Sequence, residues 1–276
     1  MAIVLPPESG DLDVKAIATA FVEARKSNTA LTEFPGGFIP DTLDLGYAIQ
    51  AEEIKQWDDE VVAWKVGGVP PELREKYQET RLAGPVMKKT LFKVEDGGHV
   101  KLPVFGGGCS AIEVEFVMEL GDLSDLPAEG VTVEQAIGAI DRVYMGYENA
   151  SSPLTIGNDF GPLGPISDFG LNNGVIVGPE LVDWTPEKIL SQGVTTTING
   201  SEVHKGNPKP GLDGPFGAVK FLIEFLKKNN YDTSAGVLVS TGVVTGVHIA
   251  SAGDKAEISY DGQCSFSVEL VDVSDL

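Results

Sequence analysis

Residues 111–120 read Ala-Ile-Glu-Val-Glu-Phe-Val-Met-Glu-Leu, a stretch in which apolar and polar side chains alternate. A period of two predicts a β-strand with one buried face, formed here by Ile112, Val114, Phe116, Met118 and Leu120. The opposite face carries Glu113 and Glu115, with Cα atoms roughly 6–7 Å apart. Two carboxylates at this spacing can converge on one cation, and oxygen ligands suit Mg²⁺ or Mn²⁺. Glutamates on the polar face of a strand are often merely solvated, so the pair needs a third ligand.

Glu148 is the candidate third ligand. It ends a predicted strand over residues 143–148 and precedes residues 153–174, which contain eight Gly or Pro. Long irregular segments between strands are commonly functional, so we expect active-site loops over 153–174 and 205–215. The alternative is a plain surface or capping glutamate.

Lys65 lies inside the apolar run 61–66, which predicts a buried strand. A lysine in such a strand is costly unless it faces an anion or loses its proton. We therefore consider Lys65 a candidate partner for a substrate carboxylate or enolate. The alternative is a lysine on an edge strand whose ammonium reaches water.

The rest of the chain mixes helices and strands. Spacing and capping patterns predict helices over residues 13–27, 42–57, 71–81, 132–142 and 213–228. Hairpins are predicted over 194–204, around Asn199-Gly200, and over 255–271, around Asp261-Gly262. The helices concentrate before residue 81 and the strands after it.

The charge balance excludes some classes of partner. The 276 residues include 41 acidic and 20 basic side chains, for a formal net charge of −21. Such a surface repels phosphate backbones and anionic lipid, so we expect no nucleic-acid or membrane partner. Two cysteines are too few for a disulfide framework or a cysteine-based zinc site. The three histidines are scattered without ligand or triad spacing.

Two segments bear on localisation. Residues 1–11 lack the basic region and long apolar stretch of a signal peptide. The uncharged run 237–253 is broken by Ser, Thr, Gly and His, which favours strand and turn over a membrane helix. We expect a cytoplasmic protein.

The motifs together resemble the 2-keto-4-pentenoate hydratase family of the fumarylacetoacetate hydrolase-like superfamily. The resemblance follows the family's order through Gly46-Tyr47-Ala48-Ile49-Gln50, Trp64-Lys65-Val66-Gly67, Ile112-Glu113-Val114-Glu115, Ala139 to Glu148, Thr197-Ile198-Asn199-Gly200 and Ser240 to Val247. It implies an α+β fold, a mixed β-roll with a helical N-terminal portion. We expect an N-terminal subdomain over residues 1–80 that contributes the lysine strand, and a catalytic β-roll over 81–276.

The resemblance also implies roles for individual residues. Glu113, Glu115 and Glu148 correspond to the ligands of Mg²⁺ or Mn²⁺, Lys65 to the family's catalytic lysine, and Thr241 to a residue near the substrate carboxylate. Two positions depart from the pattern, because Ala83 stands where the family has Asp and Val69 where it has Thr or Ser. Asp159, in the irregular loop, is a candidate replacement for the missing acid.

The implied activity is metal-dependent addition of water to a 2-hydroxy-2,4-dienoate, giving a 4-hydroxy-2-oxo acid in the catabolism of aromatic compounds. A cation that polarises a 2-oxo group equally serves decarboxylation of a vinylogous 2-oxo diacid. Hydrolysis of an acylpyruvate C–C bond and non-catalytic binding of a 2-oxo acid are further alternatives. The expected partner is a small 2-oxo acid, and we expect a homo-oligomer.

Overall fold

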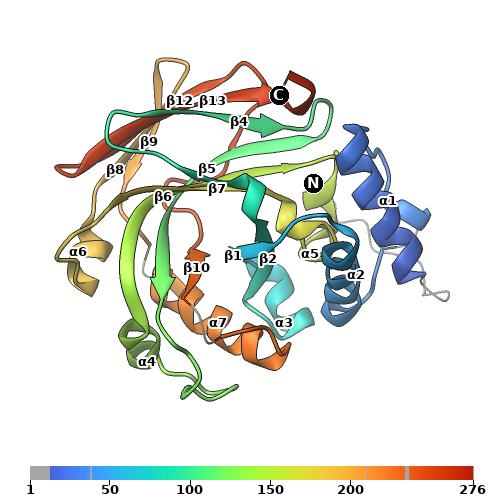
Figure 1. The fold of residues 1–276 in the computed structure, drawn as a ribbon, viewed down its shortest axis with the longest axis horizontal. Helices are drawn as coiled ribbons and strands as arrows, with labels where there is room; N and C mark the ends of the chain where they lie inside the picture. Colours follow the sequence, from blue (N-terminus) through green and yellow to red (C-terminus); the bar gives the residue numbers. More distant parts are fainter. Residues whose placement is uncertain (1–12, 38, 210, 234–235, 276) are drawn as a thin grey trace.

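Two long antiparallel strands, β5 (Cys109–Leu120) and β6 (Ile140–Ser152), run through the centre of the protein (Figure 1). The structure is a computed structural model that describes residues 13–37, 39–209, 211–233 and 236–275. The face of β5 that carries Ile112, Val114 and Phe116 is fully buried. The alternation in the sequence therefore predicts this strand and its buried face correctly.

The larger sheet is built around this pair in the order β2-β1-β10-β5-β6-β7-β3, and a short strand, β11, pairs with β5. Its other members are β1 (Val61–Gly68), β2 (Arg81–Met87), β3 (Leu91–Lys93), β7 (Asn172–Glu180), β10 (Val237–Ser240) and β11 (His248–Ile249). Strands β1 and β10 are parallel, as are β3 and β7, so the sheet is mixed.

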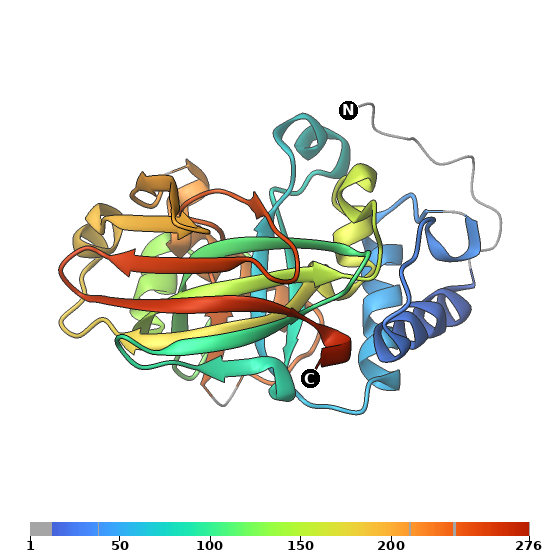
Figure 2. The ribbon, with the colours of Figure 1, turned by 90° about the horizontal axis from the view of Figure 1, so that it is seen from above.

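A second sheet of five strands lies over the first, as Figure 2 shows with the red and orange strands crossing the green and yellow ones. Its order is β4-β13-β12-β8-β9, with β4 (His99–Val104), β8 (Val194–Ile198), β9 (Ser201–Gly206), β12 (Lys255–Tyr260) and β13 (Cys264–Asp272). Both predicted hairpins are present. Asn199 and Gly200 have φ values of 49° and 80°, which explains why Asn-Gly occupies that turn.

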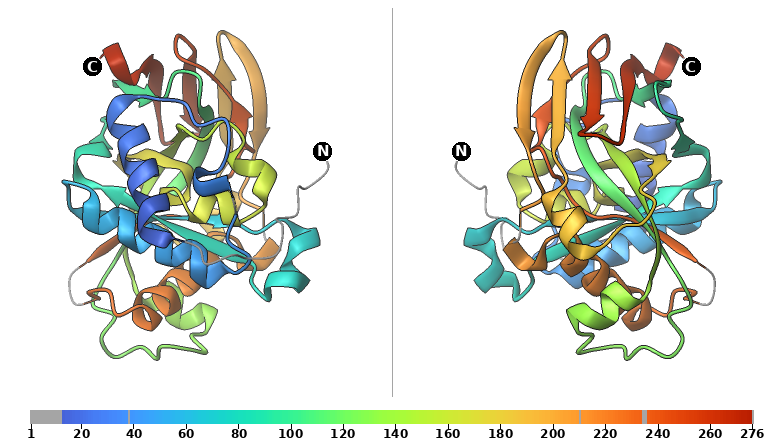
Figure 3. Two further views of the ribbon diagram at one scale, coloured as in Figure 1. Left: turned by 90° about the vertical axis from the view of Figure 1, so that its right-hand side faces the viewer. Right: turned by 90° about the vertical axis from the view of Figure 1, so that its left-hand side faces the viewer.

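Helices cover two sides of the larger sheet (Figure 3). They are α1 (Val14–Ser27), α2 (Leu43–Gln56), α3 (Arg74–Tyr77), α4 (Val133–Gly138), α5 (Leu163–Ile166), α6 (Pro186–Ser191) and α7 (Gly214–Lys228). Helix α7 packs on α4, β1 and β2, and its apolar face joins the inner faces of both sheets in the main core. Helices α1 and α2 pack together over a smaller core of their own. The α+β fold with a helical N-terminal portion is confirmed.

Three predictions about individual elements were wrong. The helix expected over 71–81 is a short turn plus α3, because Gln78 takes a left-handed conformation and Arg81 pairs with Gly68 in the sheet. The helix expected to reach 142 ends at Gly138, because Ile140 pairs with Leu120. The irregular segment 153–174 contains short helical turns, and β7 begins within it at 172.

The division at residue 80 stays a proposal. Strand β1 precedes that boundary but is hydrogen-bonded between β2 and β10 of the larger sheet. Residues 1–11, on which the expected absence of a signal peptide rests, lie outside the described residues. Within the described ranges, no helix has the length and apolar character that crossing a membrane requires.

Candidate metal centre and its cavity

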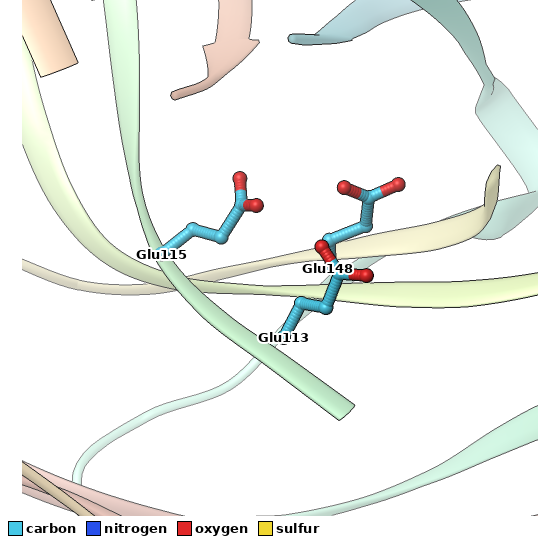
Figure 4. Close-up of side chains that lie close together, drawn as sticks. All are labelled: Glu113, Glu115 and Glu148. Atoms are coloured by element: carbon cyan, nitrogen blue, oxygen red, sulfur yellow. The ribbon is translucent and has the colours of Figure 1, made fainter. Parts of the chain in front are cut away.

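Three glutamates meet on the polar side of β5 and β6 (Figure 4). Glu113 lies directly opposite Glu148 in the antiparallel register, and Glu115 is two residues along the same face. One carboxylate oxygen from each of the three lies within 4.8 Å of the others. The structure thus brings together all three residues that the sequence suggested as ligands.

Burial makes this cluster electrostatically unfavourable without a cation. Glu115 and Glu148 are each 1% exposed, and Glu113 is partly exposed. Burial, and then the charge of Glu148, raises the pKa of Glu113 to about 7, and the same two causes hold the pKa of Glu115 well above its usual value. A divalent cation would offset this repulsion, and the all-oxygen donor set suits Mg²⁺ or Mn²⁺.

Neighbouring donors hold two of the carboxylates in place. Ser240 Oγ and the backbone N–H of Gly242 donate to Glu115 Oε2 at 2.6 and 3.0 Å. Asn172 Nδ2 donates to Glu148 Oε1 at 3.0 Å. The other oxygens of the cluster accept no hydrogen bond from the described residues. They are therefore free to act as ligands, which is the arrangement expected of oriented metal-binding carboxylates.

Lys65 is the cation nearest to the cluster among the described residues. It is 6% exposed, and its Nζ lies 3.3 Å from Glu148 Oε1. Burial lowers the pKa of Lys65, but the charges of Glu148, Glu113 and Glu115 together raise it above its ordinary value. Because β1 is an interior strand, the alternative of an edge lysine that reaches water does not apply.

A cavity of about 340 Å³ lies beside the cluster, and Glu148 is not part of its lining. Lys65, Glu113 and Glu115 supply its charged lining. Val247, in the loop after β10, and Ile249, in β11, contribute apolar lining and are 52% and 80% exposed. The cavity therefore combines a buried lysine, carboxylates of the glutamate cluster and an apolar wall, a lining that suits a small organic acid.

A tightly constrained segment covers Lys65. Residues 169–171 all have positive φ, and a Cβ on Gly170 would lie 3.0 Å from Lys65 Cδ. A Cβ on Gly84, the register partner of Lys65, would lie 2.8 Å from Gly170 Cα. Only glycine at position 84 allows the two backbones to approach this closely.

A buried ion pair anchors that segment to the N-terminal helix. Arg25 Nε lies 2.5 Å from Asp168 Oδ1, and both side chains are almost fully buried. Arg25 Nη1 also donates to the carbonyl of Asn172 at 3.1 Å, one residue along from the constrained segment. Helix α1 thereby fixes both the cover over Lys65 and the start of β7, from which Asn172 reaches Glu148.

Thr241 and Asp159 lie outside the cavity that contains Lys65. Thr241 is buried, and its Oγ1 donates to the carbonyl of Phe116 at 3.0 Å. It lines a smaller adjoining cavity. Asp159 lines another adjoining cavity, whose wall shares Cys109 and Asn158 with the first. Thr241 and Asp159 therefore line cavities that adjoin the one lined by Glu113 and Glu115.

The two departures from the family pattern lie away from the glutamates. Ala83 is fully buried in the main core, opposite Val66, on the face of β2 away from Lys65. Val69 is buried, and its carbonyl accepts from Arg74 Nε at 2.9 Å. Neither residue lines the cavity, so these departures remove no polar group from its lining.

Sequence reasoning missed Ser240, Asn172 and Gly242. Ser240 could have been found, because it precedes the predicted Thr-Gly pair and lies beside Lys65 once β1 and β10 are paired. Asn172 gave no local signal, since it lies in a segment that was expected to be irregular. Its role depends on the pairing of β6 with β7.

The sequence matches no protein-family model and no curated protein. Among solved structures, it is similar to 4-oxalocrotonate decarboxylase from Pseudomonas putida G7 complexed with magnesium and adipate, with a TM-score of 0.75 and 23% identity over 94% of this chain and 97% of that chain. The same enzyme complexed with calcium and acetate matches with a TM-score of 0.71 and 22% identity over 94% and 97% of the two chains.

A third solved structure is more distant. It is fumarylpyruvate hydrolase from Pseudomonas aeruginosa in complex with Mn²⁺ and pyruvate, with a TM-score of 0.52 and 16% identity over 79% of this chain and 94% of that chain. These likenesses confirm the fumarylacetoacetate hydrolase-like fold that the sequence motifs implied.

Proposed function

We propose that this chain is a metal-dependent lyase acting on unsaturated 2-oxo acids, and that decarboxylation of a vinylogous 2-oxo diacid is the reaction its site supports best. The observation that carries the proposal is that Lys65 meets the cluster of Glu113, Glu115 and Glu148 beside a cavity that Lys65, Glu113 and Glu115 line. Glu113, Glu115 and Glu148 would hold Mg²⁺ or Mn²⁺. When bound, such an ion supplies Lewis-acid polarisation of the 2-oxo group.

Lys65 supplies the fixed positive charge. Its stem lies under the covering segment and its ammonium lies beside Glu148, so it is pre-oriented towards an anion in the cavity. In the decarboxylation, the C–C bond to the departing carboxylate breaks and CO₂ leaves. The electron pair moves through the adjacent double bond onto the 2-oxo oxygen, which takes one proton. Lys65 stabilises the charge that develops on that oxygen.

Hydration of a 2-hydroxy-2,4-dienoate is the second candidate, and Asp159 is the observation that favours it. Addition of water at the distal alkene carbon needs a group that orients and activates water. Apart from Lys65 and the metal-binding glutamates, the titratable side chain lining the cavity in the described part of the chain is Cys109, and burial raises its pKa to about 11. Asp159 could supply the base only from the adjoining cavity.

Two other activities from the sequence analysis have less support. Hydrolysis of an acylpyruvate C–C bond needs a Glu–His base, and none of the three histidines lines the cavity within the described residues. The structural relatives add support for an enzyme over a simple binding protein, since those proteins are a decarboxylase and a hydrolase crystallised with divalent metals. A cytoplasmic location and a homo-oligomeric state stay predictions.

The test offers a 2-oxo-3-enedioate and a 2-hydroxy-2,4-dienoate separately, with Mg²⁺ or Mn²⁺ or with EDTA, and follows the products by NMR. We expect metal-dependent CO₂ release from the diacid. A 4-hydroxy-2-oxo acid formed from the dienoate would favour hydration instead. The Glu119→Gln variant is the control for a carboxylate outside the cluster, because Glu119 lies on the same strand. It should turn over the diacid like the wild type. If neither compound turns over with either metal, the lyase proposal is wrong.

A further inference from the structure

Ile249, in β11, is the most exposed large apolar side chain of the described residues, at 80%. Val243 and Val247 are also exposed, and all three residues line the cavity beside the glutamates. Single exposed apolar side chains are common on protein surfaces, but a group of them around one cavity marks a binding site. The three side chains therefore indicate an apolar ligand group at this end of the cavity.

Strand pairing places Ile249 on the same face of the sheet as the glutamates. Ile249 is the register partner of Ala111 in β5, and Ala111 is in turn the partner of Ala150 in β6. The pair Glu113 and Glu148 lies two residues away on the same two strands. Directly paired residues and residues two apart share a face, so the two rows are roughly 7 Å apart on one face. Ala111 and Ala150 both line the cavity, and their small side chains leave room for a ligand between Ile249 and the glutamates.

A second cavity of about 510 Å³ continues from the first beyond Ile249. The two cavities share the lining residues Cys109, Ser110, Asn158 and Ile249. Cys109 is four residues before Glu113 on β5, so the two side chains share a face and lie about 13 Å apart along the strand. One face of β5 therefore leads from the glutamates to the second cavity.

The lining of the second cavity suits an uncharged group. Within the described residues, no lysine, arginine or histidine lines it, and Asp159 is its one acidic residue. Phe105, Ile156 and Ile249 supply apolar lining. A carboxylate bound there would lose water without gaining a counter-ion, and it would face Asp159. The electrostatics therefore favour an uncharged, mainly apolar substituent.

We propose that Ile249 binds an uncharged apolar substituent of the substrate, which extends along β5 from the 2-oxo end at the glutamates into the second cavity. This inference rests on the proposed function and narrows its substrate class to 2-oxo acids that carry an uncharged tail beyond the reacting carbons. Ile249 is then a specificity-determining residue, because it contacts the tail and lies one row away from the glutamates.

Saturated 2-oxo acids test this inference without any turnover. Calorimetry with the wild-type protein and Mn²⁺ should show affinity that rises from pyruvate through 2-oxohexanoate to 2-oxooctanoate, by about 3- to 4-fold for each methylene that is buried. 2-Oxooctanedioate has the same chain length and a second carboxylate at the far end. It should bind more weakly than 2-oxooctanoate, because the second cavity offers that carboxylate no positive charge.

Two substitutions of Ile249 separate a tail contact from a structural role. Ile249→Ser should lose about 10-fold of its affinity for 2-oxooctanoate, with the affinity for pyruvate changed far less. Ile249→Lys should reverse the preference, so that 2-oxooctanedioate binds more tightly than 2-oxooctanoate. Val182→Ser is the matched control, because Val182 is 70% exposed and lines neither cavity.

Each contrary result has its own meaning. An equal dependence on chain length in the wild type and Ile249→Ser would overturn the inference. If that variant also sediments as a smaller species than the wild type, the exposed apolar group is instead a contact between copies of this chain. Ile249-dependent binding of 2-oxooctanoate without turnover of any diacid would contradict only the proposed reaction. Failure of all these acids to bind in the presence of Mn²⁺ would refute both proposals.

Discussion

Glu113 and Glu148 face each other directly across the β5–β6 ladder, each on the polar side of its strand. Like charges in directly opposed positions of a sheet destabilise it. Here a third carboxylate, Glu115, joins them, and Lys65 contributes one positive charge to the group. The arrangement is unfavourable for folding and favourable for binding a divalent cation, and this conflict is the basis of the first prediction.

Replacing Glu148 by Gln should weaken Mn²⁺ binding by at least about 10-fold, because the site loses one ligand charge while its shape is kept. Without metal, the variant should be at least as resistant to urea as the wild type, since one repulsive charge has been removed. Calorimetric titration with Mn²⁺ and urea unfolding in EDTA check the two parts. Glu119→Gln should bind Mn²⁺ like the wild type, and unchanged affinity in Glu148→Gln would refute the metal site.

Lys65→Met should separate metal binding from catalysis. The methionine keeps the apolar stem and removes a charge that repels the cation, so Mn²⁺ should bind at least as tightly as in the wild type. The turnover of the 2-oxo acid should fall about 10²- to 10³-fold, as when one stabilising donor is removed from an active site. The metal-free protein should lose about 3 kcal/mol of unfolding free energy, because Glu148 loses its buried partner. Wild-type kcat/KM in this variant would show that Lys65 takes no part in the reaction.

Asn172 should act as a positioning residue for Glu148. Asn172→Ala removes the donor to Glu148 Oε1, and we expect roughly 10- to 100-fold weaker Mn²⁺ binding. The matched control is Asn173→Ala, since Asn173 is the next residue of β7 and donates to the carbonyl of Pro103 instead. Manganese titration of both variants decides the matter. Equal losses of Mn²⁺ affinity in the two variants would indicate a general disturbance of β7 and would contradict the positioning role of Asn172.

Glu53 should make stability depend on pH. Its carboxyl is fully buried and forms no hydrogen bond with a described residue. Burial, and then the charge of Asp168, holds its pKa well above the usual value. The native state therefore keeps a proton that the unfolded chain releases. Stability falls as pH rises above the ordinary glutamate pKa, by up to about 1.4 kcal/mol per pH unit, until the native pKa is reached.

Glu53→Gln removes this titration and keeps the shape of the side chain. The variant should match the wild type near pH 4 and become progressively more stable than it as the pH rises above 5. Urea unfolding at each pH measures the difference. Glu52→Gln, a partly exposed neighbour on α2, should show no such divergence. Parallel profiles for Glu53→Gln and the wild type would mean that Glu53 is ionised in the native protein.

Local patterns were sufficient for much of the fold and for two of the three clustered glutamates. The strand over 111–120 follows from its alternation, and the two hairpins follow from their turn residues, because both signals lie within a few neighbouring positions. The convergence of Glu113 and Glu115 was visible for the same reason. The helix expected over 71–81 failed because the pairing of Arg81 with Gly68 is not a local property.

The sequence by itself determined many of the helices and strands, the polar face of β5 and the all-oxygen chemistry of the glutamates, since residue type and short periodicity decide these. Only the tertiary structure decided that β1 is an interior strand, that Asn172 reaches Glu148, that Ala83 faces the core and that Ile249 pairs with Ala111 beside the cavity. Each of these depends on strands far apart in the chain pairing in one register. A shift of a single residue would turn every side chain to the other face.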